Sequence, residues 1–352
     1  MKMIYKNANG GTCDIVVEDG RIVYLGKVDE DGIDLHGDTV YPGLIDIHSH
    51  GCIGFDTMDG GHLPEMSRFL ARQGVTAWLP TTMTMDADSI AAVTNAPIVH
   101  APDAAQVLGF HMEGPYIAER YKGAQNADFI QMPDIEAFER FQNVRMVTIA
   151  PELAGSIDFI ERCEAVVSLG HTACDYDTAV RAIKAGANCL THTCNAMPPL
   201  LHRDPGPIGA AAEKGAYAQV ICDGLHIHKS MILALYRLFG PERMILISDS
   251  MRATGMPDGV YDLGGQTMTV ENRVARTADG ALAGSTSTLL DCVKTAISFG
   301  IPAADAFAMA SRTPATLLGL NKGEIVPGFD ADFITVNEQY DVTRTVIAGR
   351  PI

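Results

Sequence analysis

Basic residues are scarce in this chain, and no stretch is long and apolar enough to suggest a membrane-spanning helix. The 352 residues include 26 Lys and Arg against 43 Asp and Glu, which gives a net charge of −17 at pH 7. This field repels the phosphate backbone of nucleic acids, so we expect neither a nucleic-acid partner nor a membrane partner. A small anionic ligand remains compatible, because one Arg and one His in a pocket can outweigh a distant field.

Paired cysteines are also missing. The eight cysteines are scattered and form no close Cys-x-x-Cys pair. We therefore expect reduced, buried thiols rather than a disulfide framework or a zinc-thiolate site. The first residues, Met1 to Asp14, mix Lys, Tyr, Asn and Asp and do not read as a signal peptide, so we expect a cytoplasmic protein.

Short apolar segments that end in polar or turn residues alternate with helical stretches along most of the chain. The eight predicted strands are Leu44–His50, Ala77–Thr82, Val107–Pro115, Val144–Glu152, Ala165–Thr172, Cys189–Met197, Ala218–Gly224 and Met244–Ser250. The predicted helices are His62–Gln73, Asp86–Val93, Ser156–Cys163, Asp175–Ala185, Lys229–Phe239 and a further one within Ser285–Ala296. Alternation of this kind is typical of parallel βα units, and eight units predict an α/β fold, a (β/α)8 TIM-like barrel.

The two ends of the chain have a different pattern. Residues 1–40 and 322–352 contain short alternating segments with Gly turns, such as Cys13–Val17 and Asp332–Val336. Neither end can bury a sheet face alone, so we expect them to pair into one small β-sandwich domain beside the barrel. The barrel itself then spans residues 41–321.

Six residues that can bind metal ions fall at or near the carboxyl ends of the predicted strands, where a TIM barrel keeps its active site. They are His48, His50, Glu113, His171, His192 and Asp249. His48 and His50 lie two positions apart on one strand, so both imidazoles can reach one ion. Neutral imidazole and carboxylate together suit Zn²⁺, Fe²⁺ or related divalent ions, and two close ions would share a bridging carboxylate.

Each of these residues has a simpler explanation when taken alone. A single His in an apolar strand is more often a hydrogen-bonded core residue than a ligand, and His111 could be of that kind or could support a ligand from behind. A His-x-His pair is common by chance. The metal-site prediction depends on six suitable residues falling together at strand ends.

Several motifs resemble a known family. The segment 42–51, Pro-Gly-Leu-Ile-Asp-Ile-His-Ser-His-Gly, resembles the opening strand of the amidohydrolase superfamily. More specific segments resemble the N-acetylglucosamine-6-phosphate deacetylases. They are His-Met-Glu-Gly-Pro-Tyr at 111–116, Leu-Gly-His-Thr at 169–172, Thr-His-Thr-Cys-Asn-Ala-Met at 191–197, Arg-Asp-Pro-Gly at 203–206, Asp-Gly-Leu-His at 223–226, Ser-Asp-Ser at 248–250 and Leu-Ala-Gly-Ser at 282–285. The resemblance covers essentially the whole chain.

This resemblance implies metal-dependent hydrolysis of the acetamide of N-acetylglucosamine 6-phosphate to glucosamine 6-phosphate and acetate, in amino-sugar catabolism. Glu113, His171 and His192 match ligands of a main metal ion, and His48 and His50 match those of a second ion. Asp249 matches the catalytic acid/base, which would take a proton from the attacking water and return it to the leaving amine. Matches to substrate contacts are Ala124, Gln125, Asn195, Ala196, Arg203, His226, Leu282, Ala283 and Gly284. Arg203 and His226 would address the phosphate, and the resemblance also implies a homodimer.

Gln125 is a departure from the family pattern. The family usually has His after Gly-Ala, whereas this chain has Gln125 after Gly123 and Ala124. A Gln side chain can donate a hydrogen bond but cannot become a cation. Either the second metal ion takes over the role of that His, or the substrate preference has changed.

Three alternatives stay open. The nearest is an N-acetylgalactosamine-6-phosphate deacetylase, which acts on an epimer. A second is another amidohydrolase; many of those use a modified Lys after the fourth strand, and the segment Val144–Glu152 contains no Lys. The third is a metal-free barrel that serves as a binding or scaffold protein.

Overall fold

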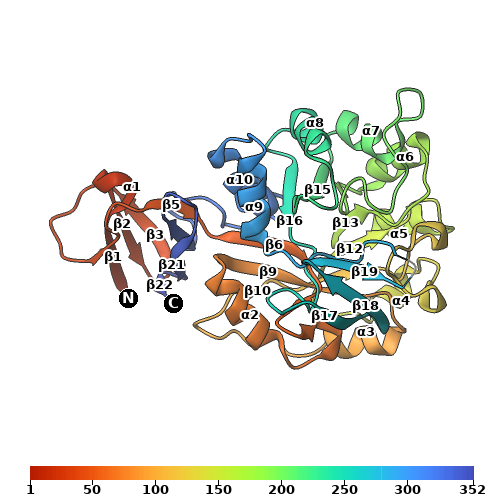
Figure 1. Ribbon diagram of the computed structural model, residues 1–352, viewed down its shortest axis with the longest axis horizontal. Coiled ribbons are helices and arrows are strands. Elements are labelled where there is room, and N and C mark those ends of the chain that lie inside the picture. The colour runs from red at the N-terminus through yellow and green to blue at the C-terminus, as the bar shows by residue number, and fades with distance from the viewer. Residues whose placement is uncertain (279) are drawn as a thin grey trace.

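Parallel strands form the centre of the molecule in the computed structural model, which describes residues 1–278 and 280–352 (Figure 1). Within these residues, eight neighbouring positions of the barrel are taken by β6 (Leu44–Ser49), β9 (Val75–Thr82), β10 (Gln106–Val107) with β11 (Phe110–Glu113), β12 (Val144–Ile149), β13 (Val166–Leu169), β14 (Cys189–Leu190), β15 (Tyr217–Ile221) and β16 (Met244–Ile247). The last strand returns to the first: Ser250 forms a parallel bridge with Ser49, and the Asp249 N–H donates to the His48 carbonyl at 2.9 Å. The predicted barrel is confirmed.

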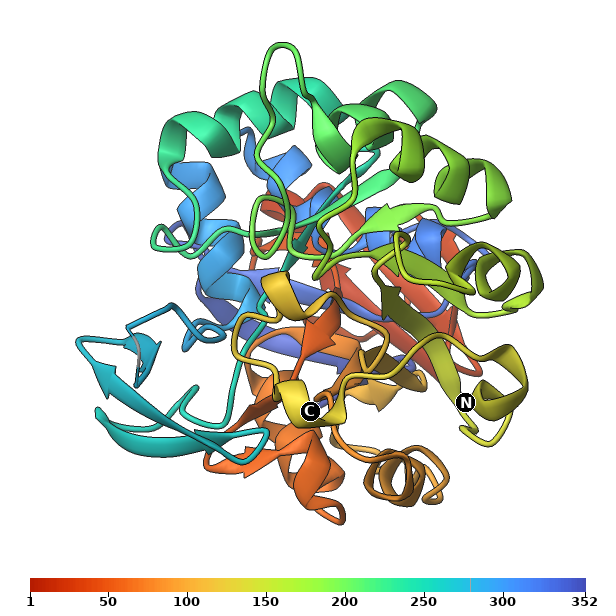
Figure 2. The same ribbon diagram turned by 90° about the vertical axis from the view of Figure 1, so that its right-hand side faces the viewer.

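Helices pack around these strands (Figure 2). Helices that match or overlap the predicted ranges are α2 (Leu63–Arg72), α3 (Ala87–Thr94), α5 (Ser156–Arg162), α6 (Tyr176–Ala185), α8 (Lys229–Phe239) and α9 (Leu289–Ser298). The α3 and α9 helices end one and two residues past the predicted ends. The sequence analysis missed α4 (Ile135–Phe138), α7 (Gly206–Lys214), α10 (Ala303–Met309) and α11 (Arg312–Leu317). All residues of β6 and β9 are buried, as expected for parallel strands covered by helices. In the described part of the chain, no helix has both the length and the apolar character needed to cross a membrane.

Polar side chains begin several of these helices. Asp175 accepts a hydrogen bond from the Thr178 N–H at the start of α6, and Thr288 and Asp291 form a reciprocal capping pair at the start of α9. These contacts satisfy N–H groups that have no partner within a helix. Local sequence therefore fixes where these helices start, while their buried faces hold them against the strands.

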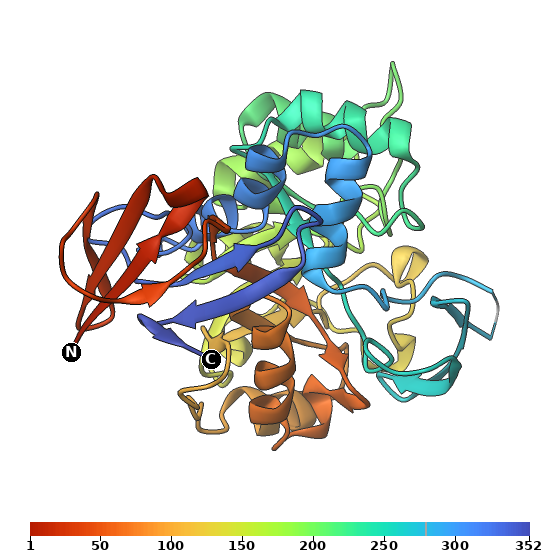
Figure 3. The same ribbon diagram turned by 60° about the vertical axis from the view of Figure 1, so that its left-hand side comes forward.

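The two chain ends form the smaller β domain (Figure 3). One sheet contains β1 (Lys2–Asn7), β2 (Cys13–Glu18), β3 (Arg21–Leu25) and β4 (Ile33–Asp34), and short α1 (Ala8–Gly11) lies beside it. The other contains β5 (Thr39–Pro42), β20 (Phe333–Val336), β21 (Val342–Ile347) and β22 (Arg350–Pro351). Tyr5 and Phe333, one from each sheet, meet edge to face with ring centroids 5.0 Å apart. The sheets share an apolar core, and β5 runs two residues past the predicted boundary at residue 40.

A three-stranded antiparallel sheet between β16 and α9 was not predicted. It consists of β17 (Gly259–Leu263), β18 (Gln266–Glu271) and β19 (Val274–Thr277), and Figure 2 shows it standing at one side of the barrel. Gly264 and Gly265 join β17 to β18 with positive φ angles of 57° and 80°, which suits a two-residue hairpin turn. We call residues 259–277 the flap, because its Leu263 lies over the mouth of the barrel.

A buried ion pair stabilises the C-terminal segment of the β domain. The Lys322 Nζ lies 2.5 Å from Asp332 Oδ2 and 2.9 Å from Asp330 Oδ2. The other oxygen of Asp332 accepts a hydrogen bond from the Ala348 N–H at 2.6 Å. Lys322 is 6% exposed and Asp332 is 2% exposed, so neither charge can turn to water if its partner is lost.

We expect Lys322→Met to destabilise the protein by about 3–5 kcal/mol, because it leaves the Asp332 carboxylate buried without its cation. The midpoint of thermal unfolding measures this loss. Lys294→Met is the matched control: it removes a surface ion pair with Asp341, which is worth at most about 1 kcal/mol. Equal midpoints for the two variants would contradict the structural role of Lys322.

Candidate metal centre and pocket

The six predicted ligand residues meet at the carboxyl ends of the barrel strands. Glu113 ends β11, and His48 lies within β6 with His50 just after it. The other three lie two residues past the ends of their strands: His171 after β13, His192 after β14 and Asp249 after β16. The rim of the barrel thus gathers side chains that are up to about two hundred residues apart in the sequence.

Glu113 is the centre of this group. Its Oε1 lies 3.0 Å from the Nε2 of His192, 3.2 Å from that of His171 and 3.3 Å from that of His48. Its Oε2 lies 3.2 Å from the Nε2 of His50. Two triads with mutually close ligand atoms result, His48–His50–Glu113 and Glu113–His171–His192, and they share the carboxylate.

For His48 and His171, a hydrogen bond on the side of the ring away from Glu113 determines which ring nitrogen faces the Glu113 carboxylate. The Nδ1 of His171 lies 2.9 Å from the Tyr121 carbonyl, which can only accept, so this nitrogen carries the proton. The Nδ1 of His48 lies 3.0 Å from the Gln219 Oε1, which sets the same arrangement. In the neutral rings, both Nε2 lone pairs then point at Glu113, where His171 and His192 approach to 3.0 Å between their Nε2 atoms. Converging lone pairs and a carboxylate are what a divalent cation requires, so these residues fit a metal site.

Gln219 is a functional residue that the sequence analysis missed. It lies in the middle of β15, is fully buried, and supports His48 from outside the ligand group. The signal was present, because an uncharged amide in the otherwise apolar segment Tyr217–Ile221 needs a buried partner. His111, in contrast, bonds the Ile47 carbonyl at 3.1 Å and the Thr148 hydroxyl at 2.8 Å, so it supports the strands rather than binding an ion.

Asp249 lies against the triad of His48, His50 and Glu113. Its Oδ1 is 3.4 Å from the Nε2 of His48 and 3.4 Å from that of His50. Burial alone would raise the pKa of this carboxyl, but the neighbouring His48 and His50 outweigh burial and lower it. Asp249 is therefore a carboxylate at neutral pH, and it can accept a proton.

Three of the six ligand-type residues have a strained backbone. The φ angles of His171, His192 and Asp249 are 46°, 27° and 47°, in the left-handed region that side-chain-bearing residues seldom occupy. Such conformations cost about 1–3 kcal/mol each and persist where the surroundings fix them. For Asp249 the fixing contacts are hydrogen bonds to the His48 carbonyl at 2.9 Å and from the Ser285 N–H at 2.7 Å.

A cavity of about 410 Å³ opens onto the metal ligands. Of the predicted substrate contacts, it is lined by Ala124, Gln125, Asn195, Ala196, His226, Leu282, Ala283 and Gly284. Arg120, Tyr121 and Leu263 also line it and were not predicted. Arg203 does not line it, because it is exposed on the loop between β14 and α7.

His226 pairs with a buried carboxylate beside this cavity. Its Nδ1 lies 2.7 Å from Asp223 Oδ2. Burial lowers the pKa of this imidazole, but the hydrogen bond to Asp223 and the charge of that carboxylate outweigh burial and raise it. The Asp223 contact engages Nδ1 and leaves Nε2 as the other polar atom of the ring.

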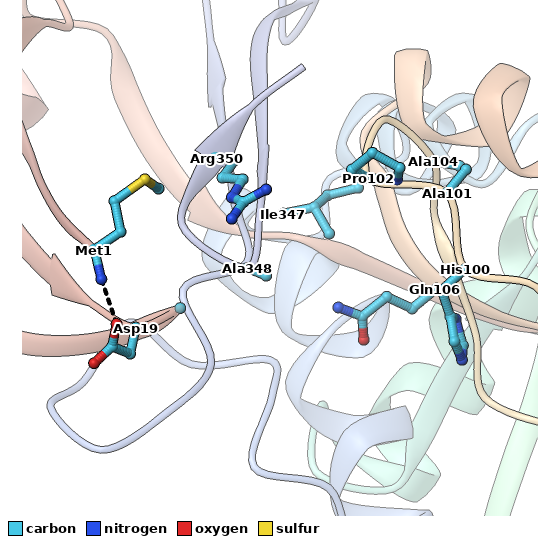
Figure 4. Close-up of a pocket in the computed structure, with 11 residues that line it drawn as sticks. Met1, Asp19, His100, Ala101, Pro102, Ala104, Gln106, Ile347, Ala348 and Arg350 are labelled. Atoms are coloured by element: carbon cyan, nitrogen blue, oxygen red, sulfur yellow. Dashed lines mark hydrogen bonds and ion pairs between the residues drawn. The ribbon is translucent and has the colours of Figure 1, made fainter.

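A larger cavity, of about 670 Å³, lies elsewhere between the β domain and the barrel (Figure 4). It is lined by residues that include Asp19, His100 and Arg350, and the Met1 ammonium pairs with Asp19 there. Its lining contains neither of the potential metal-binding groups found in the described part of the chain. The smaller cavity is therefore the candidate active site.

Comparison with known proteins agrees with this geometry. The family model described as "Amidohydrolase family" matches residues 39–352. The chain belongs to the amidohydrolase family. It is 38% identical over 345 residues to an N-acetylglucosamine-6-phosphate deacetylase from Vibrio furnissii, covering 93% of this chain and 86% of that protein.

Two further proteins bear on the substrate. An N-acetylgalactosamine-6-phosphate deacetylase from Escherichia coli O157:H7 is 33% identical and covers 95% of this chain and 93% of its own. A solved mutant of the N-acetyl-D-glucosamine-6-phosphate deacetylase from Mycobacterium smegmatis, in complex with N-acetyl-D-glucosamine-6-phosphate, superposes with a TM-score of 0.92 at 30% identity, covering 99% of each chain. The resemblance to these deacetylases that the sequence motifs indicated is confirmed.

We expect Gln219→Leu to weaken metal binding about 10–100-fold, because His48 loses the acceptor that orients it. Calorimetric titration of the metal-free protein with Zn²⁺ measures this. Gln219→Glu keeps an acceptor oxygen and should retain most of the affinity. A Leu variant that binds Zn²⁺ as tightly as the wild type would show that His48 needs no such support.

Proposed function

We propose that this protein hydrolyses the acetamide of N-acetylglucosamine 6-phosphate, releasing acetate and glucosamine 6-phosphate, in amino-sugar catabolism. The observation that carries the proposal is the shared Glu113 carboxylate between two triads, with Asp249 beside it and His226 in the same cavity. The deacetylases to which the chain is similar support the substrate assignment.

The residues of this chain divide the chemistry between them. A divalent ion at such a donor set, when bound, polarises a carbonyl oxygen and makes water more acidic. Asp249 would accept the proton of the attacking water at its carboxylate and return it to the amide nitrogen as the carbon–nitrogen bond breaks. Its lowered pKa suits the first of these steps, because the acceptor must be ionised at neutral pH.

Two ions, zinc or iron, fit this site in our proposal. Each triad offers three donors, and imidazole with carboxylate suits both metals. His48 and His50 support the second ion, since without them the remaining donors form a single triad. Elemental analysis of the purified protein measures the identity and the number of ions per chain.

His226 would hold the phosphate end of the substrate. Its raised pKa keeps the imidazole protonated further into the neutral range, and a charged donor binds phosphate oxygens more strongly than a neutral one. The overall negative charge of the chain does not oppose this, because His226 acts at contact distance inside the cavity.

A screen of acetylated amino sugars tests the proposed function. We expect acetate release from N-acetylglucosamine 6-phosphate, and much slower release from N-acetylglucosamine, which lacks the anion that His226 would bind. The galactosamine epimer is the second candidate, favoured by the relative that acts on it. Faster turnover of N-acetylgalactosamine 6-phosphate would select that candidate, and no acetate from any phosphorylated sugar would refute both.

Asp249→Asn should lower kcat by about 10²–10⁴-fold, because the amide cannot accept a proton. Acetate release under substrate saturation measures kcat, and elemental analysis checks that the metal content is unchanged. Asp262→Asn, an exposed carboxylate on the flap, is the matched control and should keep wild-type turnover. A metal-loaded Asp249→Asn enzyme with near wild-type kcat would assign the proton transfer to another group.

We further propose a cytoplasmic homodimer in which Arg203 of one subunit reaches the phosphate in the cavity of the other. The cytoplasmic location is supported by the eight free thiols, which suit a reducing compartment. The dimer is supported by exposed leucines beside the two predicted phosphate contacts: Leu200 and Leu201, 39% and 51% exposed, precede Arg203, and Leu225, 49% exposed, precedes His226. Exposed apolar side chains next to both predicted phosphate contacts suit a surface that a partner subunit covers.

Subunit mixing tests the shared site. Arg203→Ala and Asp249→Asn homodimers should each be weakly active, and exchange of their subunits should restore activity, because one mixed cavity then has both residues intact. Sedimentation velocity checks the dimer in the same samples. No gain on mixing, with exchange verified, would place Arg203 outside the partner's cavity.

A further inference from the structure

Both polar atoms of the Gln125 side-chain amide have hydrogen-bond partners in the protein. It is 2% exposed, its Nε2 lies 2.6 Å from Glu113 Oε2, and its Oε1 lies 2.7 Å from the Thr84 N–H. The Nε2 also approaches the Met83 sulfur at 3.9 Å. Although Gln125 borders the cavity, its amide group is already occupied by protein partners.

The identity of these partners fixes the orientation of the amide. The Thr84 N–H can only donate, so the atom facing it must be the amide oxygen. The amide nitrogen must then face the Glu113 carboxylate, which can only accept when ionised. Turning the amide toward a substrate would leave the buried Thr84 N–H without a partner and remove one hydrogen bond from the buried Glu113 carboxylate, and losses of that kind are costly.

The bond from Gln125 distinguishes the two oxygens of Glu113. Oε1 faces His48, His171 and His192, all within 3.3 Å. Oε2 faces His50 at 3.2 Å and Gln125 at 2.6 Å. Gln125 therefore holds the oxygen that faces His50, and His48 and His50 approach the same carboxylate from its two oxygens.

We propose that Gln125 is a positioning residue that sets the Glu113 carboxylate for the second cation, the one held with His48 and His50. This inference rests on the two-ion site of the proposed function and assigns no substrate contact to Gln125. A neutral amide serves this role well, because it donates a hydrogen bond to Oε2 without adding a positive charge that would repel the cation. The Gln in place of the family's usual His thus accompanies the complete pair of His48 and His50.

A neighbouring amide provides a matched control. Gln266, on the flap strand β18, donates its Nε2 to the Ala124 carbonyl at 2.5 Å. It thereby anchors the same loop one residue before Gln125 but, among the residues that the structure describes, makes no hydrogen bond to Glu113. Loss of Gln266 loosens the loop, whereas loss of Gln125 also removes the hydrogen bond to the carboxylate.

The test is a calorimetric titration of the full-length, metal-free protein with Zn²⁺, which resolves the first and second equivalents. We expect Gln125→Met, which keeps the side-chain length but removes the donor, to weaken the second equivalent about 10–100-fold. The first equivalent should change much less, and Gln266→Met should bind both equivalents like the wild type. No substrate is involved, so a failed deacetylation assay and a failed positioning role give different results.

Three results would overturn the inference: wild-type affinity for both equivalents in Gln125→Met, equal weakening of both, or the same second-site loss in Gln266→Met. If Gln125→Met does not fold, a crystal structure of the Zn²⁺-loaded wild type decides. Gln125 Nε2 within hydrogen-bond distance of Glu113 Oε2 supports the role, and an amide turned into the cavity contradicts it.

Discussion

A buried carboxylate surrounded by four imidazoles is the interaction on which the functional end of the molecule depends. Glu113 is 2% exposed, and an ionised carboxylate at that depth is stable only with charged or hydrogen-bonding partners. Burial raises the pKa of Glu113, but His48 and His171 outweigh burial and hold the pKa well below its usual range. Every strand that supplies one of these partners must therefore end at the same rim.

The contact that closes the barrel also brings two residues of the site together. The strands β16 and β6 meet through the Ser49–Ser250 bridge and the hydrogen bond from the Asp249 N–H to the His48 carbonyl. Just below, the Ser248 hydroxyl donates to the buried Asp46 at 2.5 Å. Because Asp249 and His48 are joined at this seam, closure of the barrel holds the backbone of the proposed proton acceptor beside that of a proposed metal ligand.

The flap, which lies outside the barrel, also contributes to the site. The flap contributes Leu263 to the cavity and anchors the loop that carries Gln125 through Gln266. The β domain, at the left end of the molecule in Figure 1, supplies no residue to the cavity. Changes in the flap can therefore alter the cavity while the candidate metal ligands stay the same.

The amino-acid sequence by itself determined the barrel, the terminal β domain and the six ligand-type residues, because apolar strands with polar ends repeat along the chain and each ligand is local to one strand end. It did not reveal the flap, whose Gly264–Gly265 turn was overlooked, or the buried Gln219, whose partner His48 is 171 residues away. It also assigned Gln125 to substrate by resemblance, whereas its amide faces Glu113 and Thr84. Only the tertiary structure decides such pairings, because a hydrogen bond requires that the barrel bring two side chains within about 3 Å of each other. The apolar pattern of the sequence shows where a strand ends, but it does not show which side chains of other strands lie beside that end.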